Sequence, residues 1–165
     1  MTPPPQDQAL PLAIRAAVAE DEPAVRKITA EVFAPVSIDA TIERMLGRVG
    51  APWHDVKGDK LIDELRANPE GCFVAELKGG VVGYITTREW PSVSRGEIAN
   101  LAVAAEWQGR GIGRRLIEHA LARFRRMGLQ RACISTLEPN AVGRHLYPAM
   151  GFQEAVREIR YVMPL

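Results

Sequence analysis

Over the first seventy positions, the spacing of apolar residues is first that of a strand and then that of helices. Leu12–Val18 is an apolar run that predicts a strand. Asp21 follows at a position suited to cap a helix, and the apolar residues after it recur every three or four positions. Ser37–Leu46 and Asp59–Leu65 repeat this helical spacing and flank residues 50–58, which we expect to form an irregular loop. The chain is therefore expected to begin with one strand followed by helices.

From residue 72 onward the period shortens to that of β-strands. Cys72–Leu77 and Val81–Thr87 are β-rich runs separated by a glycine-containing turn, which predicts an antiparallel hairpin. Gly96–Val103 is a third such run, and it leads through a glycine-rich turn into a helical stripe that ends near Met127. Arg131–Leu137 predicts the next strand.

The C-terminal part adds a helix and more strands. Residues 138–150 have helical apolar spacing, and Gly151 is placed to end that helix. Phe152–Leu165 carries apolar residues at alternate positions, so we expect one or two strands there with a tight connection near Arg157. Hairpins mixed with strand–helix–strand crossovers predict a single α/β domain of mixed α+β character. Its sheet should be mixed, mostly antiparallel, with about six to seven strands flanked by helices.

The composition is that of one globular domain. The chain has 165 residues, of which 47% are apolar and 25% charged, so one core is expected over residues 11–165. Residues 1–10 are rich in proline and glutamine and are expected to form a disordered tail. The 21 basic residues nearly balance the 20 acidic ones, which leaves no overall field to attract a polyanion. We therefore expect no nucleic-acid partner.

Location and metal binding are constrained by what the chain lacks. The N-terminus has no signal-peptide pattern, and no apolar run approaches the length of a membrane span. A cytoplasmic protein without a membrane partner is expected. Cys72 and Cys133 lie in apolar, strand-like runs, where we expect them to pack in the core. Neither the cysteines nor the three histidines have metal-ligand spacing, so no metal site is expected.

The most informative segment is Gln108–Gly113, which has three glycines at alternate positions between a predicted strand and a predicted helix. Backbone N–H groups of such a turn can converge on an anion at the positive end of a helix. Arg110, Arg114 and Arg115 add positive charge, which suits a ligand with several phosphates. A solvated strand–helix corner is the alternative. The spacing fits neither the dinucleotide-binding motif nor a P-loop.

These residues resemble a known family. Gln108–Gly113 reads Q-G-R-G-I-G, which matches the Gln/Arg-x-x-Gly-x-Gly/Ala signature of the GCN5-related N-acetyltransferase (GNAT) superfamily. Leu101–Val103 precedes the turn at the distance found in that family. Asn140, Leu146–Tyr147 and Gly151–Phe152 resemble its N…LY…GF segment. The resemblance extends from about Leu12 to the C-terminus.

The resemblance implies an acetyl-coenzyme A site in a wedge between two splayed strands, here Gly96–Val103 and Arg131–Leu137. The backbone of Leu101 and Val103 would bind the pantetheine arm, and the glycine-rich turn would bind the pyrophosphate. The residues implied to contact the cofactor are Leu101, Ala102, Val103, Gln108, Gly109, Arg110, Gly111, Ile112, Gly113, Arg114 and Asn140.

Catalysis of acetyl transfer to an amine makes three demands. An alkyl ammonium with a pKa of about 10 must lose a proton before its nitrogen attacks, the oxyanion needs a donor, and the departing thiolate needs a proton. By resemblance Tyr147 would be the acid, Glu97 the base and the backbone N–H of Val103 the donor. A water chain could replace Glu97. Pro148 withholds an N–H and restricts Tyr147, so the helix is expected to kink or end there.

The acceptor is open at this stage: a primary amine of a small molecule or of a protein. The segments implied to frame its site are residues 36–68, including Trp53, and the strand end at Glu89 and Trp90. His54 could face an acceptor or lie on the surface. The resemblance also allows a homodimer. Two rival functions remain, namely a non-catalytic acyl-coenzyme A sensor or interaction module on the same fold, and transfer of a longer acyl group.

Overall fold

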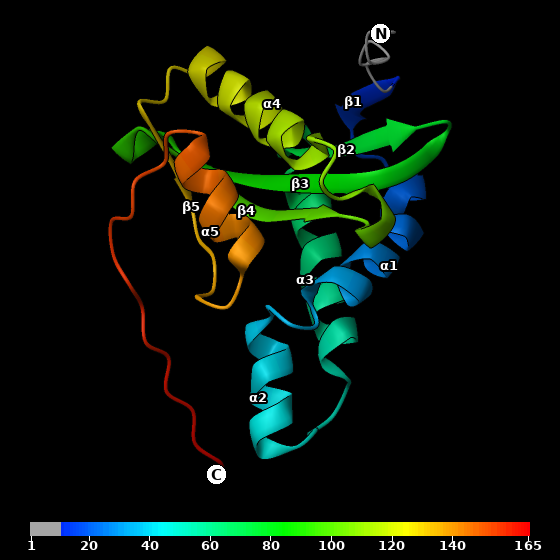
Figure 1. Ribbon diagram of the computed structural model, residues 1–165, viewed down its shortest axis with the longest axis vertical. Helices are drawn as coiled ribbons and strands as arrows, with labels where there is room; N and C mark the ends of the chain where they lie inside the picture. Colours follow the sequence, from blue (N-terminus) through cyan, green and yellow to red (C-terminus); the bar gives the residue numbers. More distant parts are fainter. Residues whose placement is uncertain (1–10) are drawn as a thin grey trace, which may run out of the picture.

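A five-stranded sheet forms the centre of the molecule (Figure 1). The computed structural model describes residues 11–165, and the expected tail over residues 1–10 lies outside this part. The strands lie in the order of the sequence: β1 (Leu12–Ala16), β2 (Cys72–Leu77), β3 (Gly80–Trp90), β4 (Arg95–Val103) and β5 (Arg131–Ile134). The first four pair antiparallel, whereas β5 is parallel to β4. The predicted mixed, mostly antiparallel sheet is confirmed, with five strands within residues 11–165 rather than six to seven.

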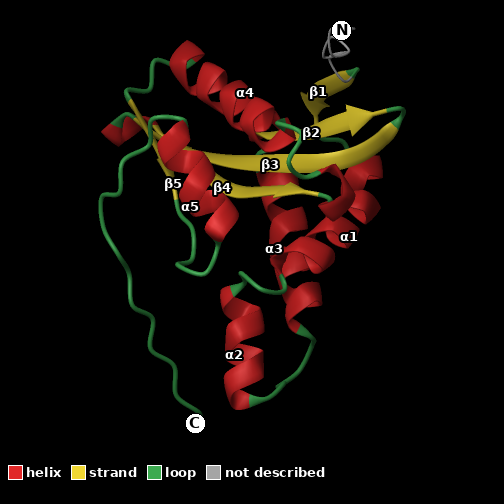
Figure 2. Ribbon diagram, in the orientation of Figure 1, coloured by secondary structure: helices red, strands yellow, loops and turns green. Residues whose placement is uncertain are grey.

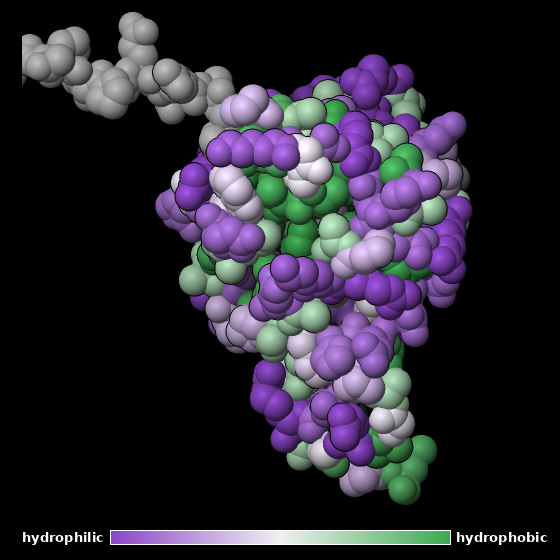
Figure 3. Space-filling model, turned by 90° about the vertical axis from the view of Figure 1, so that its right-hand side faces the viewer, coloured by the Kyte–Doolittle hydropathy of each residue, from purple (hydrophilic) through white to green (hydrophobic). Residues whose placement is uncertain are grey.

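Helices cover both faces of this sheet (Figure 2). They are α1 (Glu22–Phe33), α2 (Ile38–Leu46), α3 (Trp53–Ala67), α4 (Ile112–Arg126) and α5 (Ala141–Ala149). On one face, buried residues of α1 and α3 form an apolar cluster with β2, β3 and the end of β4. On the other face, α4 forms a second cluster, against which Leu146 and Tyr147 of α5 pack. The α1 side also carries a shallow pocket with Lys27, Glu31 and Glu106 among its lining residues; Figure 3 views this largely hydrophilic side.

The helix α3 is longer than the sequence pattern indicates. It begins at Trp53, so the expected irregular loop over residues 50–58 is wrong from residue 53 onward. Gly58 lowers helix propensity, which is why the segment reads as a loop. In the structure Gly58 is buried against α1, and a Cβ there would come within 2.9 Å of the Arg26 guanidinium. Close packing of α3 on α1 therefore outweighs the local preference.

The strands expected over Phe152–Leu165 are wrong, because no residue of this segment joins the sheet. α5 ends at Ala149, and Gly151 turns the chain with a φ of +93°. Beyond it the segment runs extended and exposed (Figure 1). The alternating pattern is present, but the segment has no strand partner among residues 11–165.

The edge strand β5 is also shorter than expected and ends at Ile134 instead of Leu137. Cys72 is buried as expected, whereas Cys133 on β5 is exposed. The expectation of core packing is therefore wrong for Cys133. Ala132 and Ile134 pack toward α4, so Cys133 points to the opposite face of the sheet, where it is exposed.

Candidate active site

The strands β4 and β5 separate after a short paired stretch. Arg95–Ile98 pairs with Arg131–Ile134, and the remainder of β4 pairs with β3 alone within the described chain. The register of β3 against β4 shifts so that Ala99 is bulged, since Thr87 faces Ile98 and Thr86 faces Asn100. The splayed pair expected from the sequence is thus present. Residues 99–103 have no strand partner on the β5 side within the described chain, and this side of β4 is called the wedge below.

Two residues of β4 turn backbone groups toward this wedge. Ala104 N donates to Val82 O at 2.9 Å, and hydrogen-bonded positions alternate along an antiparallel pair. The N–H and C=O of Ala102 therefore face β3, whereas those of Leu101 and Val103 point away from it. Gln108 Nε2 donates to Val103 O at 2.9 Å, which ties the glycine-rich turn to the end of the strand. Ala102 packs its side chain in the α1–α3 cluster.

The turn after β4 has the conformation of an anion site. Gly109 and Gly111 have φ values of +73° and +78°, which other residues adopt only with strain. No atom lies within 4 Å of a Cβ placed on either glycine, so the turn borders open space. Gly111 is the N-cap of α4 and offers no side chain to its first N–H groups. These free donors and the helix dipole favour an anion here.

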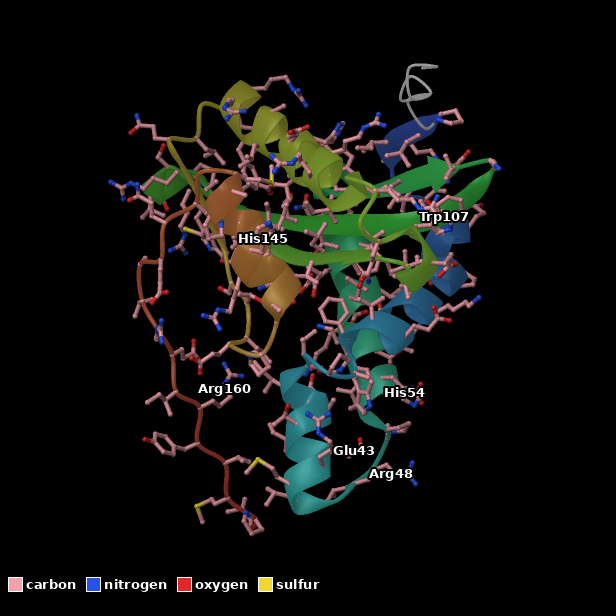
Figure 4. All side chains as sticks on the ribbon, in the orientation of Figure 1. Glu43, Arg48, His54, Trp107, His145 and Arg160 are labelled. Atoms are coloured by element: carbon pink, nitrogen blue, oxygen red, sulfur yellow. The ribbon has the colours of Figure 1, made fainter. Side chains whose placement is uncertain are left out.

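The residues around the turn have distinct roles in the structure. Ile112 is buried and anchors α4. Gly113 lets α4 lie close to α5, because a Cβ placed on Gly113 would be 3.6 Å from Leu146 Cδ2. Arg110 stacks on Trp107, with 4.8 Å between guanidinium carbon and ring centre; Trp107 is labelled in Figure 4. Arg114 is exposed. Arg115, in contrast, donates to Leu12 O at 3.1 Å and is held by β1.

Tyr147 lies half-buried on α5, on the α4 side of the sheet. Its ring packs edge-on against Phe152 at 6.2 Å between ring centres. Burial raises the pKa of Tyr147, so the hydroxyl holds its proton at neutral pH. α5 ends one residue after Pro148, as expected, and Tyr147 O accepts from Phe152 N at 3.1 Å.

Asn140 caps α5. Its Oδ1 accepts from Gly143 N at 3.2 Å, and its Nδ2 donates to Thr136 Oγ1 at 2.9 Å. The side chain therefore fixes the segment that follows β5 to the start of α5. A direct contact of Asn140 with a cofactor stays a prediction.

Glu97 lies half-buried in the paired part of β4, opposite Arg88 of β3 and Cys133 of β5. It precedes Leu101 by four residues, a strand rise of roughly 13 Å before the bulge shortens it. At that separation, Glu97 would reach a group bound at Leu101 through water rather than directly.

A polar cluster beside the bulge was not anticipated from the sequence. Asn100 Nδ2 donates to Glu64 Oε2 at 2.8 Å and to Thr86 Oγ1 at 2.9 Å. Lys57 Nζ lies 3.4 Å from Asn100 Oδ1 and 4.2 Å from the centre of the Phe33 ring. Burial lowers the pKa of Lys57. The available signal was Asn100 itself, a polar residue within the apolar run Ile98–Val103.

Residues 37–152 match the sequence profile described as the Acetyltransferase (GNAT) family. The chain belongs to this family. The match spans the wedge, the glycine-rich turn and Tyr147, so the GNAT assignment rests on the segment that forms the candidate site.

Curated relatives of this GNAT chain are mycothiol acetyltransferases. The protein of Cellulomonas flavigena is 30% identical over 98% of this chain and 47% of its own length. That of Thermobispora bispora is 30% identical over 86% of this chain and 46% of its own. The chain thus spans about half the length of these relatives.

Solved structures share the GNAT fold. The PaiA N-acetyltransferase of Thermoplasma acidophilum in complex with coenzyme A has a TM-score of 0.73 at 19% identity, covering 89% of this chain and 92% of that one. A GNAT family acetyltransferase of Brucella melitensis in complex with acetyl-CoA has a TM-score of 0.59 at 25% identity, covering 87% and 83%. At 19% identity, the likeness to PaiA shows the fold alone.

Two of the residues expected to frame a GNAT acceptor site, Glu89 and Trp53, make hydrogen bonds to neighbouring parts of the fold. Glu89 accepts from Thr87 Oγ1 at 2.6 Å and from Asn68 Nδ2 at 3.1 Å, and its side chain is 11% exposed, so it stabilises the end of β3. Trp53 N donates to Glu43 Oε2 at 2.7 Å at the start of α3. His54 is exposed beside Asp55; Figure 4 labels it with Glu43.

The described residues were compared with the requirements of a metal site and of a membrane-spanning helix. No group of three or more His, Cys, Asp or Glu residues is placed to hold a metal ion within residues 11–165. In the same range, no helix combines the length and apolar character needed to cross a bilayer.

Proposed function

We propose that this GNAT chain binds acetyl-coenzyme A in the wedge between β4 and β5 and transfers the acetyl group directly to a primary amine of a small molecule or a protein. The observation that carries the proposal is the continuity of the wedge with the glycine-rich turn. Backbone groups of Leu101 and Val103 face away from β3, and the chain then passes through one short 3-10 turn, Ala105–Trp107, into the positive-φ turn at Gly109 and Gly111.

The residues present fit the cofactor. The pantetheine arm contains amides, which can pair with the backbone groups of β4 that face away from β3, as a short strand would. Of these groups, Val103 O already accepts one hydrogen bond from Gln108 Nε2. The N–H groups at the start of α4, with Arg110 and Arg114, suit the pyrophosphate. When bound, acetyl-coenzyme A supplies the activated thioester.

The remaining residues can manage the protons of the reaction. Glu97, through water, would take the proton of the acceptor ammonium, whose pKa is about 10. The Val103 N–H would donate to the oxyanion. Tyr147 would protonate the departing thiolate, since its hydroxyl is protonated at neutral pH.

The acceptor is assigned to the α3 side of β4. Asn100 and Lys57 lie there, next to the bulge at Ala99. The acceptor is proposed only as an amine, since the curated relatives named for mycothiol acetylation are about twice as long as this chain.

The test is amine-dependent release of coenzyme A thiol. With acetyl-coenzyme A and a panel of small amines and amine-bearing peptides, the proposal predicts thiol release above the hydrolysis rate for at least one acceptor, with an equal amount of acetylated amine. Saturable binding of acetyl-coenzyme A without transfer to any amine would favour the non-catalytic module instead. Competition by acyl-coenzyme A species of increasing chain length identifies the preferred acyl group.

A further inference from the structure

Lys57 of α3 is a primary amine held against β4, beside the wedge. Its Nζ lies 3.4 Å from Asn100 Oδ1 and 4.2 Å from the centre of the Phe33 ring. The residue is half-buried, whereas lysine is mostly exposed in folded proteins. Burial of an ammonium is costly, so this position favours a neutral nitrogen.

The contact with Asn100 brings Lys57 close to the backbone that would hold the thioester. Asn100 follows the bulge at Ala99 and precedes Leu101, whose backbone groups face the wedge. Ordinary bond lengths within the asparagine place Lys57 Nζ at most about 7 Å from the Asn100 Cα. The lysine stem has four carbons and is flexible. Its rotation would bring the amine to a thioester bound beside Leu101.

The surroundings of Lys57 favour its free amine form. Desolvation by burial is the largest effect on the pKa of Lys57 and lowers it, while Asp39 and Glu64 act in the opposite direction. Only the free amine attacks a carbonyl carbon, and desolvation is one of the ways in which proteins activate a lysine as a nucleophile. Lys57 is thus better prepared for attack than a lysine in water.

The other lysines of the chain have different surroundings. Lys27, Lys60 and Lys78 are all exposed. Lys60 also lies 3.5 Å from a carboxylate oxygen of Asp39, a contact that favours the ammonium form. Lys57 alone among them lies half-buried beside the proposed site.

We propose that Lys57 is a self-acetylation site, at which the chain transfers an acetyl group from bound acetyl-coenzyme A to its own side chain. This inference rests on the proposed acetyl-coenzyme A site. The free amine of Lys57 attacks the thioester carbonyl carbon, so that a C–N bond forms and the C–S bond breaks. The nitrogen gives up one proton and the departing thiolate gains one. The products are an amide on Lys57 and coenzyme A thiol.

Two effects direct the acetyl group to Lys57. The amine and the wedge belong to one chain, and reacting groups held near each other in this way have a high effective concentration. The amide that forms is neutral, so it removes the cost of a charge at a half-buried position. The exposed lysines have neither advantage.

Peptide mass spectrometry of the full chain after incubation with acetyl-coenzyme A tests the proposal. We expect Lys57 to be acetylated at least tenfold faster than Lys27, Lys60 or Lys78. The rate should saturate with acetyl-coenzyme A, and coenzyme A should compete. The rate constant should not change when the protein is diluted tenfold, because the step lies within one chain. Lys60→Arg, on the same helix, is the matched control and should leave acetylation of Lys57 unchanged.

A short thioester, S-acetyl-N-acetylcysteamine, measures the reactivity of Lys57 without a pyrophosphate contact. Under the proposal, it should acetylate Lys57 more slowly than acetyl-coenzyme A at equal concentration and without saturation. Equal rates with the two thioesters would overturn the proposal, because the wedge would then have no part in the reaction. A rate constant that rises with protein concentration would also overturn it, since the acetyl group would come from another chain.

The panel of external amines distinguishes failure of this inference from failure of the proposed function. Amine-dependent thiol release without faster acetylation of Lys57 would overturn self-acetylation and leave the proposed transferase activity intact. If neither an external amine nor Lys57 is acetylated, both are contradicted. Saturable acetylation of Lys57 within one chain supports both the site and its cofactor.

Discussion

At the scale of single residues, Tyr147 is the clearest test of mechanism. Its raised pKa keeps the hydroxyl protonated, and a positioned general acid contributes roughly a hundredfold or more. We expect Tyr147→Phe to lower kcat about a hundredfold while the dissociation constant of acetyl-coenzyme A changes less than threefold. Steady-state kinetics and calorimetric titration measure the two quantities. Tyr161→Phe, at an exposed tyrosine, is the matched control, and equal activity of the two variants would remove Tyr147 from the mechanism.

The proposed role of Glu97 as the base can be tested by measuring how kcat/KM of Glu97→Gln depends on pH. If Glu97 takes the ammonium proton through water, Glu97→Gln should lower kcat/KM at pH 7 about tenfold or more. The deficit should shrink as the pH approaches the amine pKa of about 10, because solvent then supplies the free amine. A pH profile parallel to that of wild type would show that Glu97 is not the base.

Substitution of Gly111 tests whether the glycine-rich turn binds the pyrophosphate, and a second glycine with positive φ controls for the effect of backbone strain. A Cβ at a φ of +78° costs about 1–2 kcal/mol, and it would also enter the open space where the pyrophosphate is expected. We predict that Gly111→Ala weakens acetyl-coenzyme A binding at least tenfold. Gly47 has a φ of +82° and the same open surroundings, but it ends α2. Gly47 has a ψ of 167°, in a region that only glycine adopts readily, whereas Gly111 is left-handed with a ψ of 2°. Gly47→Ala should therefore lose at least as much stability and keep wild-type affinity; equal affinities of the two variants would contradict the pyrophosphate assignment.

At the scale of elements, Asp21 links β1 to α1. Arg15 donates to both carboxylate oxygens at 2.7 and 2.8 Å, and Val18 N donates at 2.9 Å. The hydrogen bonds from Arg15 lower the pKa of Asp21. A lowered folded pKa stabilises the protein above the unfolded value of about 4, and this contribution is lost as the pH falls through the folded value.

Asp21→Asn should accordingly reduce the free energy of unfolding by about 1–3 kcal/mol at pH 7. The difference from wild type should narrow below pH 4, as Asp21 itself becomes protonated. Urea unfolding of both proteins at pH 7 and at a pH below 4 measures the two differences in the free energy of unfolding. A difference that stays constant with pH would show that the ion pair does not carry the link between β1 and α1.

Elements were predictable from the sequence wherever local pattern and packing agree. The hairpin of β2 and β3, the strand β4 and the helix α4 carry strong periodicity and clear glycine signals. The start of α3 was missed because Gly58 reads as a breaker, although it packs against Arg26. Within the candidate site, the glycine-rich turn could be predicted from the spacing of its glycines. The cluster of Lys57, Glu64 and Asn100 could not be predicted, because its residues come from α3 and β4 and meet only in the folded chain, beside the bulge at Ala99.

At the scale of the whole molecule, the C-terminal segment, residues 152–165, shows the limit of a local pattern. Alternation over residues 152–165 predicts a strand, but a strand exists only with a partner, and pairing depends on which edge is within reach. Within residues 11–165 the outer edge of β5 and the C-terminal segment both stay unpaired. The sequence therefore indicates the backbone conformation that the segment prefers, and the presence of a partner strand decides whether a strand forms.

The most direct test of the central claim is the binding of acetyl-coenzyme A to the whole protein. A ligand that binds only the native state raises the apparent stability, by about 2.7 kcal/mol at one hundred times its dissociation constant. We predict that acetyl-coenzyme A and coenzyme A raise the midpoint of thermal unfolding, whereas ATP and NAD at equal concentration do not. No shift at saturating acetyl-coenzyme A would contradict the wedge as a cofactor site.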